Sequence, residues 1–305
     1  MSSIVSDFDK NRPYRVLILG KSGVGKTYFI GSYFYAARHC LDKVSKNWKG
    51  EIKYHIQAQL GQTEQAIHDL QEGLFEKQPG TQRKINASFR VDELNMDVVL
   101  FDLPGGDTSN EEQMARHNLD KELPWADAVL IFVSAFDAFY DGPHRESLYP
   151  VLEHYTRVLT KLRAQGREDV PVYFVYTQKD RLQTGELNGH SLTFNLGNAG
   201  IALEAAATEL GAEYHKTFVT QATGHWHDRF TPPSIDEYAP ENVVETMESL
   251  FEDMLEARCK RLGLRPQDIA KKWLKNAALT VTAVGVIAWG FSKVKKVFSF
   301  GSKDA

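Results

Sequence analysis

Residues 20–27 constrain the fold of this chain more strongly than any other part of its sequence. They read Gly-Lys-Ser-Gly-Val-Gly-Lys-Thr and fit the spacing G-x-x-x-x-G-K-[ST]. The mostly apolar, β-favouring residues 14–19 precede this loop, and residues 27–40 follow it with apolar side chains at helical spacing. A buried strand, a glycine-rich loop and a helix in this order predict an α/β fold.

The loop also predicts that phosphate groups bind here. Glycine has no side chain to block close approach, so successive backbone N–H groups can point at one anion, and the positive end of the following helix adds to them. We expect Lys26 to reach the β- and γ-phosphates of a nucleotide and the hydroxyl of Thr27 to coordinate Mg²⁺, which prefers hard oxygen ligands. The alternative is a glycine-rich turn with an ordinary solvated lysine. The expected nucleotide contacts are Gly20, Ser22, Gly23, Val24, Gly25, Lys26, Thr27 and Tyr28.

The rest of the chain alternates between strand-like and helix-like segments. The predicted strands are 51–57, 83–91, 96–101, 126–134, 170–176 and 216–220, and the predicted helices are 63–75, 145–162, 201–210 and 243–262. The first of these strands and the first helix fall in an insertion at about 48–78, and the next two strands form a hairpin. This alternation predicts a three-layer α/β/α fold with a mostly parallel sheet whose strands end along one edge.

Composition and charge restrict the class of protein further. The chain has 305 residues, 42% of them apolar, which is ample for one large domain. We expect that domain at 12–262, between a flexible N-terminus at 1–11 and a tail at 266–305. The two cysteines show no metal-ligand or redox spacing, and the polar N-terminus does not fit a secretory signal, so a cytoplasmic location is expected. The net charge is −4, and the domain has no broad basic surface, so we expect no nucleic-acid partner.

Two later strand ends carry carboxylates toward the edge where the loop lies. Residues 98–105 read Val-Val-Leu-Phe-Asp-Leu-Pro-Gly. Asp102 can hold Mg²⁺ through a bound water, and the N–H of Gly105 can bond a γ-phosphate. An aspartate at a strand end is also a common turn former, but its pairing with the phosphate loop favours the ligand role.

The second strand end is at residues 175–180, Val-Tyr-Thr-Gln-Lys-Asp. Guanine presents an N1–H and a 2-amino group side by side, and one carboxylate can accept from both, whereas adenine has no such pair. Asp180 is the candidate for this role. Gln178 or Lys179 can lay its alkyl stem over the ring and reach back toward the phosphate loop. The alternative is that Lys-Asp is a charge pair at a helix start.

These motifs, in this order, resemble the guanine-nucleotide-binding domain of the P-loop GTPases with a Ras-like core, over roughly residues 12–262. The spelling of 102–105 and 177–180 is similar to that of dynamin-type, immunity-related and Era-like GTPases. The resemblance implies that GTP or GDP binds together with Mg²⁺, held by Thr27, Asp102 and a switch threonine, Thr81, with Thr63 as its competitor. It further implies that Lys26, Thr81 and Gly105 serve hydrolysis and that the N–H of Ala222 donates to guanine O6.

The sequence departs from Ras-like enzymes in one respect that bears on catalysis. Those enzymes carry a glutamine directly after the Asp-x-x-Gly motif to orient the attacking water, but this chain has Gly106 and Asp107. We therefore expect slow intrinsic hydrolysis. Asp107, Arg83, Arg116 or a regulatory protein partner are the candidates for the missing group. The alternatives are a nucleotide-holding interaction module without turnover and an ATP-dependent phosphotransferase.

Two features lie outside these motifs. His225 and His227 alternate about Trp226, but no third ligand is evident, and a loop beside the nucleotide is favoured over a zinc site. The tail carries seven lysines against two aspartates, and they flank the uncharged residues 277–291. A helix of that length is too short to span a bilayer with ease, so we expect either an amphipathic contact with a membrane surface or packing, including a homo-oligomer.

Overall fold

The computed structural model describes residues 12–39, 53–58, 85–91, 96–102, 123–139, 143–167, 169–182, 196–224 and 238–263. The chain divides into two compact units, Met1–Leu262 and Gly263–Ala305. The architecture below is that of the first unit. The predicted tail at 266–305 and the predicted helix at 63–75 lie outside the described residues.

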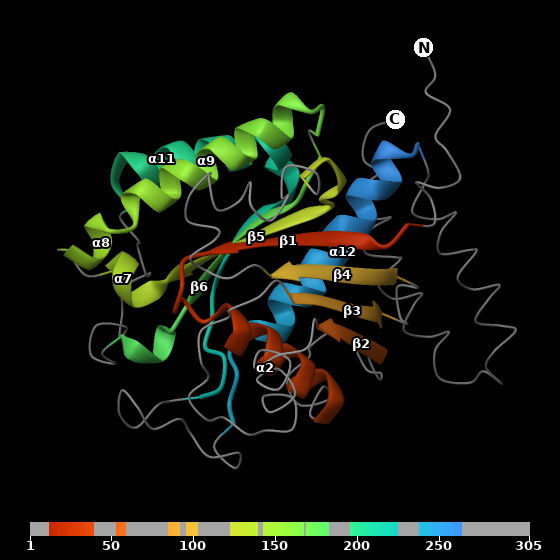
Figure 1. Ribbon diagram of the computed structural model, residues 1–305, viewed down its shortest axis with the longest axis horizontal. Coiled ribbons are helices and arrows are strands. Elements are labelled where there is room, and N and C mark those ends of the chain that lie inside the picture. The colour runs from red at the N-terminus through yellow and green to blue at the C-terminus, as the bar shows by residue number, and fades with distance from the viewer. Residues whose placement is uncertain are drawn as a thin grey trace, which may run out of the picture. The chain divides into compact units, whose positions relative to one another are not determined.

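A seven-stranded sheet forms the middle of the domain, in the order β2-β3-β4-β1-β5-β6-β7 (Figure 1). The strands are β1 (Tyr14–Gly20), β2 (Lys53–Ala58), β3 (Ile85–Val91), β4 (Met96–Asp102), β5 (Ala128–Ser134), β6 (Val172–Thr177) and β7 (His215–Val219). The five strands from β4 to β7 along the sheet are parallel, whereas β2 and β3 run antiparallel to their neighbours. This arrangement confirms the predicted mostly parallel sheet.

The antiparallel edge shows how the predicted insertion begins. The expected hairpin is present, with β3 paired to β4 from Ile85 opposite Asp102 to Val91 opposite Met96. The strand expected within the insertion is β2, and it adds to the core sheet by pairing with β3, with Tyr54 opposite Phe89. The start of the insertion therefore extends the sheet rather than forming a separate layer.

Helices cover both faces of the sheet, as predicted. They are α2 (Lys26–His39), α7 (Ala135–Phe139), α8 (Pro143–Glu146), α9 (Tyr149–Ala164), α11 (Gly197–Gly211) and α12 (Val243–Arg261). One face packs against α2 and α12, which supply Phe29, Tyr33 and Phe251 to a buried cluster with strand residues such as Ile18 and Leu130. Adjacent strand residues point to the opposite face because side chains alternate along a strand.

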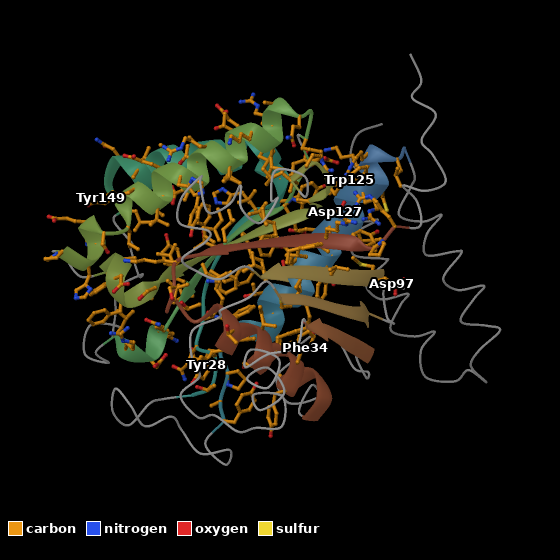
Figure 2. The ribbon with its side chains drawn as sticks, viewed as in Figure 1. Tyr28, Phe34, Asp97, Trp125, Asp127 and Tyr149 are labelled. Atoms are coloured by element: carbon orange, nitrogen blue, oxygen red, sulfur yellow. The ribbon has the colours of Figure 1, made fainter. Side chains whose placement is uncertain are left out.

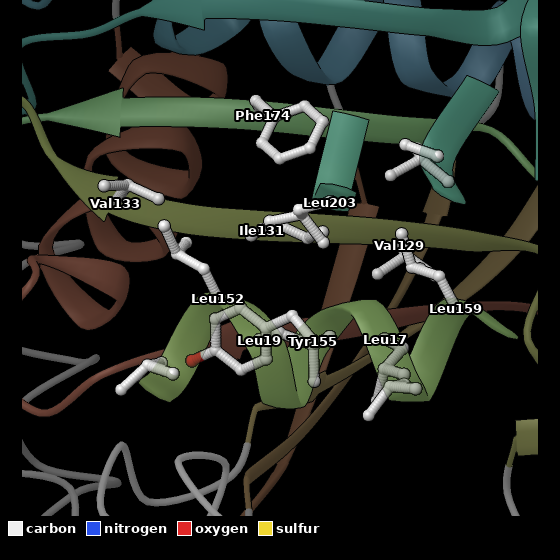
Figure 3. Packing of buried hydrophobic residues seen from close by; sticks show 14 of the residues in the cluster. Leu17, Leu19, Val129, Ile131, Val133, Leu152, Tyr155, Leu159, Phe174 and Leu203 are labelled. Carbon is white, nitrogen blue, oxygen red and sulfur yellow. The ribbon is translucent and has the colours of Figure 1, made fainter. Parts of the chain in front are cut away.

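The second cluster lies between the other sheet face and the pair α9 and α11 (Figure 3). Leu17, Leu19 and Ile131 point into it from β1 and β5, and Tyr155 of α9 and Leu203 of α11 meet them. Strands buried on both faces read as continuous apolar runs, and β5 is buried at every position. Strand β1, which leads into the phosphate loop, therefore lies between buried neighbouring strands.

The structure corrects one predicted helix and adds another. The expected helix at 145–162 is two helices, α8 and α9, separated at Ser147 and Leu148. Pro150 lies in the first turn of α9, where its missing N–H costs no intrahelical bond, so the longer helix begins there. Helix α7 was not expected, because residues 135–139 are too few to show a helical period. Within the described part of the chain, no helix combines the length and apolar character that crossing a bilayer requires.

Candidate nucleotide-binding site

The predicted phosphate loop connects β1 to α2 at the carboxyl edge of the parallel strands. Two of its glycines adopt backbone angles that side chains rarely allow, with φ of +80° at Gly23 and +91° at Gly25. The carbonyl of Gly25 accepts a hydrogen bond from the N–H of Phe29 at 2.9 Å, which joins the loop to the first turn of the helix. The chain therefore turns from strand to helix as a phosphate-cradling loop requires.

Gly20 is needed for a different reason, namely space. A Cβ on Gly20 would lie 2.9 Å from Cβ of Phe132, 3.0 Å from Cδ of Lys26 and 3.1 Å from Cγ2 of Val24. Real Cβ atoms essentially never approach a neighbour below 3.0 Å. Glycine here lets the loop fold tightly against β5 and against its own lysine.

Lys26 lies within the loop rather than in solvent. Only 5% of the residue is exposed, and its ammonium donates to the carbonyl of Gly20 at 2.8 Å and to that of Lys21 at 3.4 Å. Lys26 therefore differs from the solvated lysine on an ordinary turn that was the alternative. Thr27 and Tyr28 follow in the first helical turn and are partly exposed, and Ser22 is exposed at the tip of the loop.

Side chains from the end of β6 fasten this loop. The hydroxyl of Thr177 donates to the carbonyl of Val24 in a short hydrogen bond and lies 3.3 Å from the carbonyl of Val133. The side-chain amide of Gln178 donates to the carbonyl of Gly23 at 2.7 Å. The segment predicted to read the base is therefore bound directly to the segment predicted to hold the phosphates.

Gln178 takes an unusual conformation to reach the loop. Its backbone is left-handed, with φ of +60°, which costs roughly 1–2 kcal/mol for a residue with a side chain. Its amide oxygen accepts from the hydroxyl of Ser134 at 3.0 Å and from Arg181 at 2.8 Å. Of the two residues that the sequence offered for reaching back to the loop, Gln178 is the one that does so. Lys179 instead forms an ion pair with Glu241.

Asp180 lies in the short 3₁₀ helix η3 (Lys179–Arg181) and is partly exposed. The guanidinium of Arg181 stacks 4.4 Å from the ring centre of Phe136 in α7. The helix start of the predicted alternative is present, but Lys179 pairs with Glu241.

The loop after β7 lies next to this helix. The N–H of Lys179 donates to the carbonyl of Thr220 at 3.3 Å, and the N–H of Thr220 donates to the carbonyl of Tyr176 at 2.7 Å. Ala222, predicted to meet the base, follows in the same loop and is partly exposed. The structure therefore brings three predicted segments together, at 20–28, 178–180 and 220–224.

The remaining predicted residues can be placed only in part. Asp102 ends β4 and pairs in register with Ile18, two positions before Gly20, so its backbone lies beside the strand that leads into the loop. The other sequence candidates lie outside the described residues, namely Thr63, Thr81, Arg83, Gly105, Gly106, Asp107, Arg116, His225 and His227.

A buried charge cluster lies at the opposite edge of the sheet. The carboxylate of Asp127 accepts two hydrogen bonds from Arg12, at 2.7 and 2.9 Å, one from Arg258 at 2.7 Å and one from the N–H of Arg15 at 3.0 Å. Figure 2 shows Asp127 and the neighbouring Trp125 at this edge. Burial by itself raises the pKa of the Asp127 carboxyl, but Arg258 and Arg12 outweigh burial and hold it below its usual value. This cluster fixes the last turns of α12 to the sheet, away from the candidate site.

The sheet order, the helices on both faces and the glycine loop between β1 and α2 define a P-loop nucleoside-triphosphate-binding fold.

No family model and no curated protein sequence matches this chain. The solved structures that match this chain include the following two. The bacterial selenocysteine-specific elongation factor EF-Sec is 12% identical, with a TM-score of 0.38, over 81% of this chain and 29% of its own. The signal recognition particle receptor complex SRb-GTP/SRX from Chaetomium thermophilum is 15% identical, with a TM-score of 0.40, over 70% of this chain and 91% of its own.

Proposed function

We propose that this protein is a guanine-nucleotide-binding switch with slow or partner-stimulated GTP hydrolysis. The observation that carries the proposal is the attachment of the base-reading segment to the phosphate loop, through Thr177 to Val24 and through Gln178 to Gly23. These bonds fix Asp180 at a set position relative to the loop. A carboxylate held there can accept from the N1–H and 2-amino groups of guanine, and adenine offers no matching pair of donors.

The residues present also fit a magnesium ion. Thr27 offers a hydroxyl in the first turn of α2, and Asp102 ends the strand next to β1, so two residues with hard oxygen atoms come from neighbouring elements. Thr81 is the proposed third ligand. When bound, the ion would neutralise charge on the β- and γ-phosphates. Lys26 would turn from the carbonyl of Gly20 toward these phosphates.

Binding is tested by calorimetry on the wild-type protein and on Lys26→Ala and Asp180→Asn, with GDP, ADP and xanthosine diphosphate. We expect GDP to bind the wild type far more tightly than ADP, and Lys26→Ala to weaken both diphosphates. Asp180→Asn should lose affinity for GDP and gain affinity for the xanthine nucleotide, because the asparagine amide can donate to the 2-oxygen of xanthine. Equal affinity of the wild type for GDP and ADP would exclude guanine recognition.

Hydrolysis is proposed to be slow because the position after the Asp-x-x-Gly motif is Gly106 and not a glutamine. Positioning and charge neutralisation by Lys26 and the backbone donors of the loop would supply most of the remaining rate effect. A single-turnover assay with GTP and magnesium tests this. Fast cleavage by the purified protein alone would refute it, and complete absence of phosphate release over hours, with and without cell extract, would favour a non-hydrolysing interaction module.

We further propose, from the sequence alone, that the tail at 266–305 brings the protein to an anionic membrane surface. Lysines flank its uncharged centre, which suits the headgroup region. Flotation of the full-length protein with anionic vesicles, beside a chain ending at Leu264, tests this. Equal flotation of the two would exclude the membrane role and leave self-association, which light scattering of both chains would detect. The similarity to dynamin-type, immunity-related and Era-like GTPases stays a prediction.

A further inference from the structure

A short segment ahead of α12 is bonded along the loop that is predicted to meet the base. We call residues 238–242 the strap. The N–H of Glu241 donates to the carbonyl of Gln221 at 2.9 Å, and the N–H of Gln221 donates back at 3.2 Å. The N–H of Ala239 also donates to the carbonyl of Thr223, at 2.9 Å. The backbone of the loop after β7 is therefore bonded to the strap as one strand is to its neighbour.

The strap is in turn tied to the helix that follows the phosphate loop. Ser32 of α2 is completely buried, and its hydroxyl donates to the carbonyl of Ala222 in a short hydrogen bond. The hydroxyl of Tyr238 donates to the backbone carbonyl of Ser32 at 2.9 Å and lies 2.9 Å from the Ser32 hydroxyl. The ring of Tyr35 meets that of Tyr238 edge-on at 4.7 Å. The Ser32 hydroxyl thus connects Ala222 to α2, and the Tyr238 hydroxyl connects the strap to Ser32.

The far end of the strap reaches the base-reading helix. Glu241 pairs with Lys179, next to Asp180, and the side-chain amide of Asn242 donates to the carbonyl of Val219 at 2.8 Å. The strap therefore links the two segments that the site needs for base recognition, η3 and the loop at 220–224, to one another and to α2.

Ala222 has only a methyl side chain. Any contact that it makes with the polar edge of a base must therefore come from its backbone. The orientation of the Ala222 backbone therefore depends on the residues that bind this loop, in α2 and in the strap. We infer that Ser32 and Tyr238 are positioning residues that aim the N–H of Ala222 at the 6-oxygen of the base and so help to set nucleotide specificity. This inference rests on the proposed guanine-nucleotide function.

The test compares full-length wild-type protein with Ser32→Ala and Tyr238→Phe, using GDP, inosine diphosphate and ADP. Guanine and hypoxanthine both carry the 6-oxygen, whereas adenine carries a 6-amino group. We expect each variant to lose about tenfold in affinity for GDP and for inosine diphosphate, the effect of one misplaced hydrogen bond, with affinity for ADP unchanged. Affinity for ADP reports on the phosphate loop, so a general loss of structure would lower all three.

Two comparisons sharpen the result. Tyr149→Phe, on α9 and away from the strap, is the matched control and should bind all three nucleotides as the wild type does (Figure 2). The double variant Ser32→Ala with Tyr238→Phe should lose no more than the larger single loss, because the two hydroxyls act through one another. Parallel losses for GDP and ADP, or no loss in either single variant, would overturn the inference while leaving guanine binding by the wild type intact. If the wild type itself binds no GDP, the proposed function fails first.

Discussion

At the residue scale, the most informative position is Gln178, which joins the segment predicted to read the base to the phosphate loop. The structure shows why a neutral amide suits this chain. The amide must donate to the carbonyl of Gly23 and, at its other end, accept from Ser134 and from Arg181. A lysine has donors only, so it would match the loop carbonyl but not the two donors on the other side.

We therefore predict that Gln178→Lys weakens GDP binding and that a second change, Arg181→Gln, restores it. Two unit charges about 4 Å apart repel by about 1 kcal/mol in a water-like environment, which corresponds to roughly fivefold in affinity. Fluorescence titration of the single and double variants measures the difference. A single variant that binds GDP at least as tightly as the double variant would show that Arg181 does not decide the residue type at 178.

Asp127 gives a second prediction at this scale. Asp127→Asn removes the charge that compensates Arg12 and Arg258, both almost completely buried. Breaking a buried ion pair from one side typically costs about 3–5 kcal/mol, and we expect the free energy of unfolding to fall by about that amount in urea denaturation. Asp97→Asn, at an exposed position of β4, is the control and should change it by less than about 0.5 kcal/mol. A loss at Asp127 as small as that at Asp97 would contradict this account.

At the scale of elements, the junction of β1, the phosphate loop and α2 depends on close packing against β5. Substitutions at Gly20 and at Gly23 test two separate requirements of this junction. A Cβ at Gly20 meets Phe132 and Lys26, whereas a Cβ at Gly23 meets nothing within 4 Å and has only the positive φ against it. The same substitution thus probes space at one glycine and backbone conformation at the other.

We predict that Gly20→Ala lowers the free energy of unfolding by about 1–3 kcal/mol through overpacking, and that it weakens nucleotide binding because Lys26 must shift. Gly23→Ala should cost about 1–2 kcal/mol from its left-handed backbone, with the Lys26 side chain undisturbed. Urea denaturation with GDP titration of both variants measures this. Unchanged GDP binding in Gly20→Ala would show that the loop tolerates the added methyl group.

At the scale of the whole molecule, stability should depend on pH through His215 in β7 and Asp127 just before β5. Burial lowers the pKa of His215 in β7, and Glu204 offsets this only in part. A lowered folded-state pKa means that the unfolded chain takes up the proton first, so stability is present above the unfolded value of 6.5 and falls as the pH drops below it. Asp127, whose pKa is also lowered, adds a second loss below its ordinary value of 3.8.

We therefore predict that His215→Gln reduces the loss of stability between about pH 7 and pH 5. Urea midpoints of the wild type and the variant at both ends of this range provide the measurement, and their difference isolates His215 from the other histidines. The second loss of stability, below pH 3.8, should remain in the variant, because Asp127 is unchanged. An identical pH dependence in the two proteins would contradict the assignment to His215.

Much of the fold follows from short-range patterns in the sequence. The apolar run 14–19, the loop at 20–27 and the alternation of later segments predict most of the described strands and helices to within a few residues. They also predict the loop between β1 and α2, because glycine spacing and helix period act over neighbouring residues. The missed break between α8 and α9 depends on one proline, and α7 is too short to show a period.

Only the tertiary structure decided which side chains complete the site. Gln178 reaches a carbonyl 155 positions away, and Ser32 reaches one 190 positions away. It also decided that β2 extends the sheet and that Lys179 turns to Glu241. Hydrophobic periodicity arises from local geometry and so can be read along the chain, but a hydrogen bond between distant segments depends on how the finished layers bring them together, and no local pattern records it.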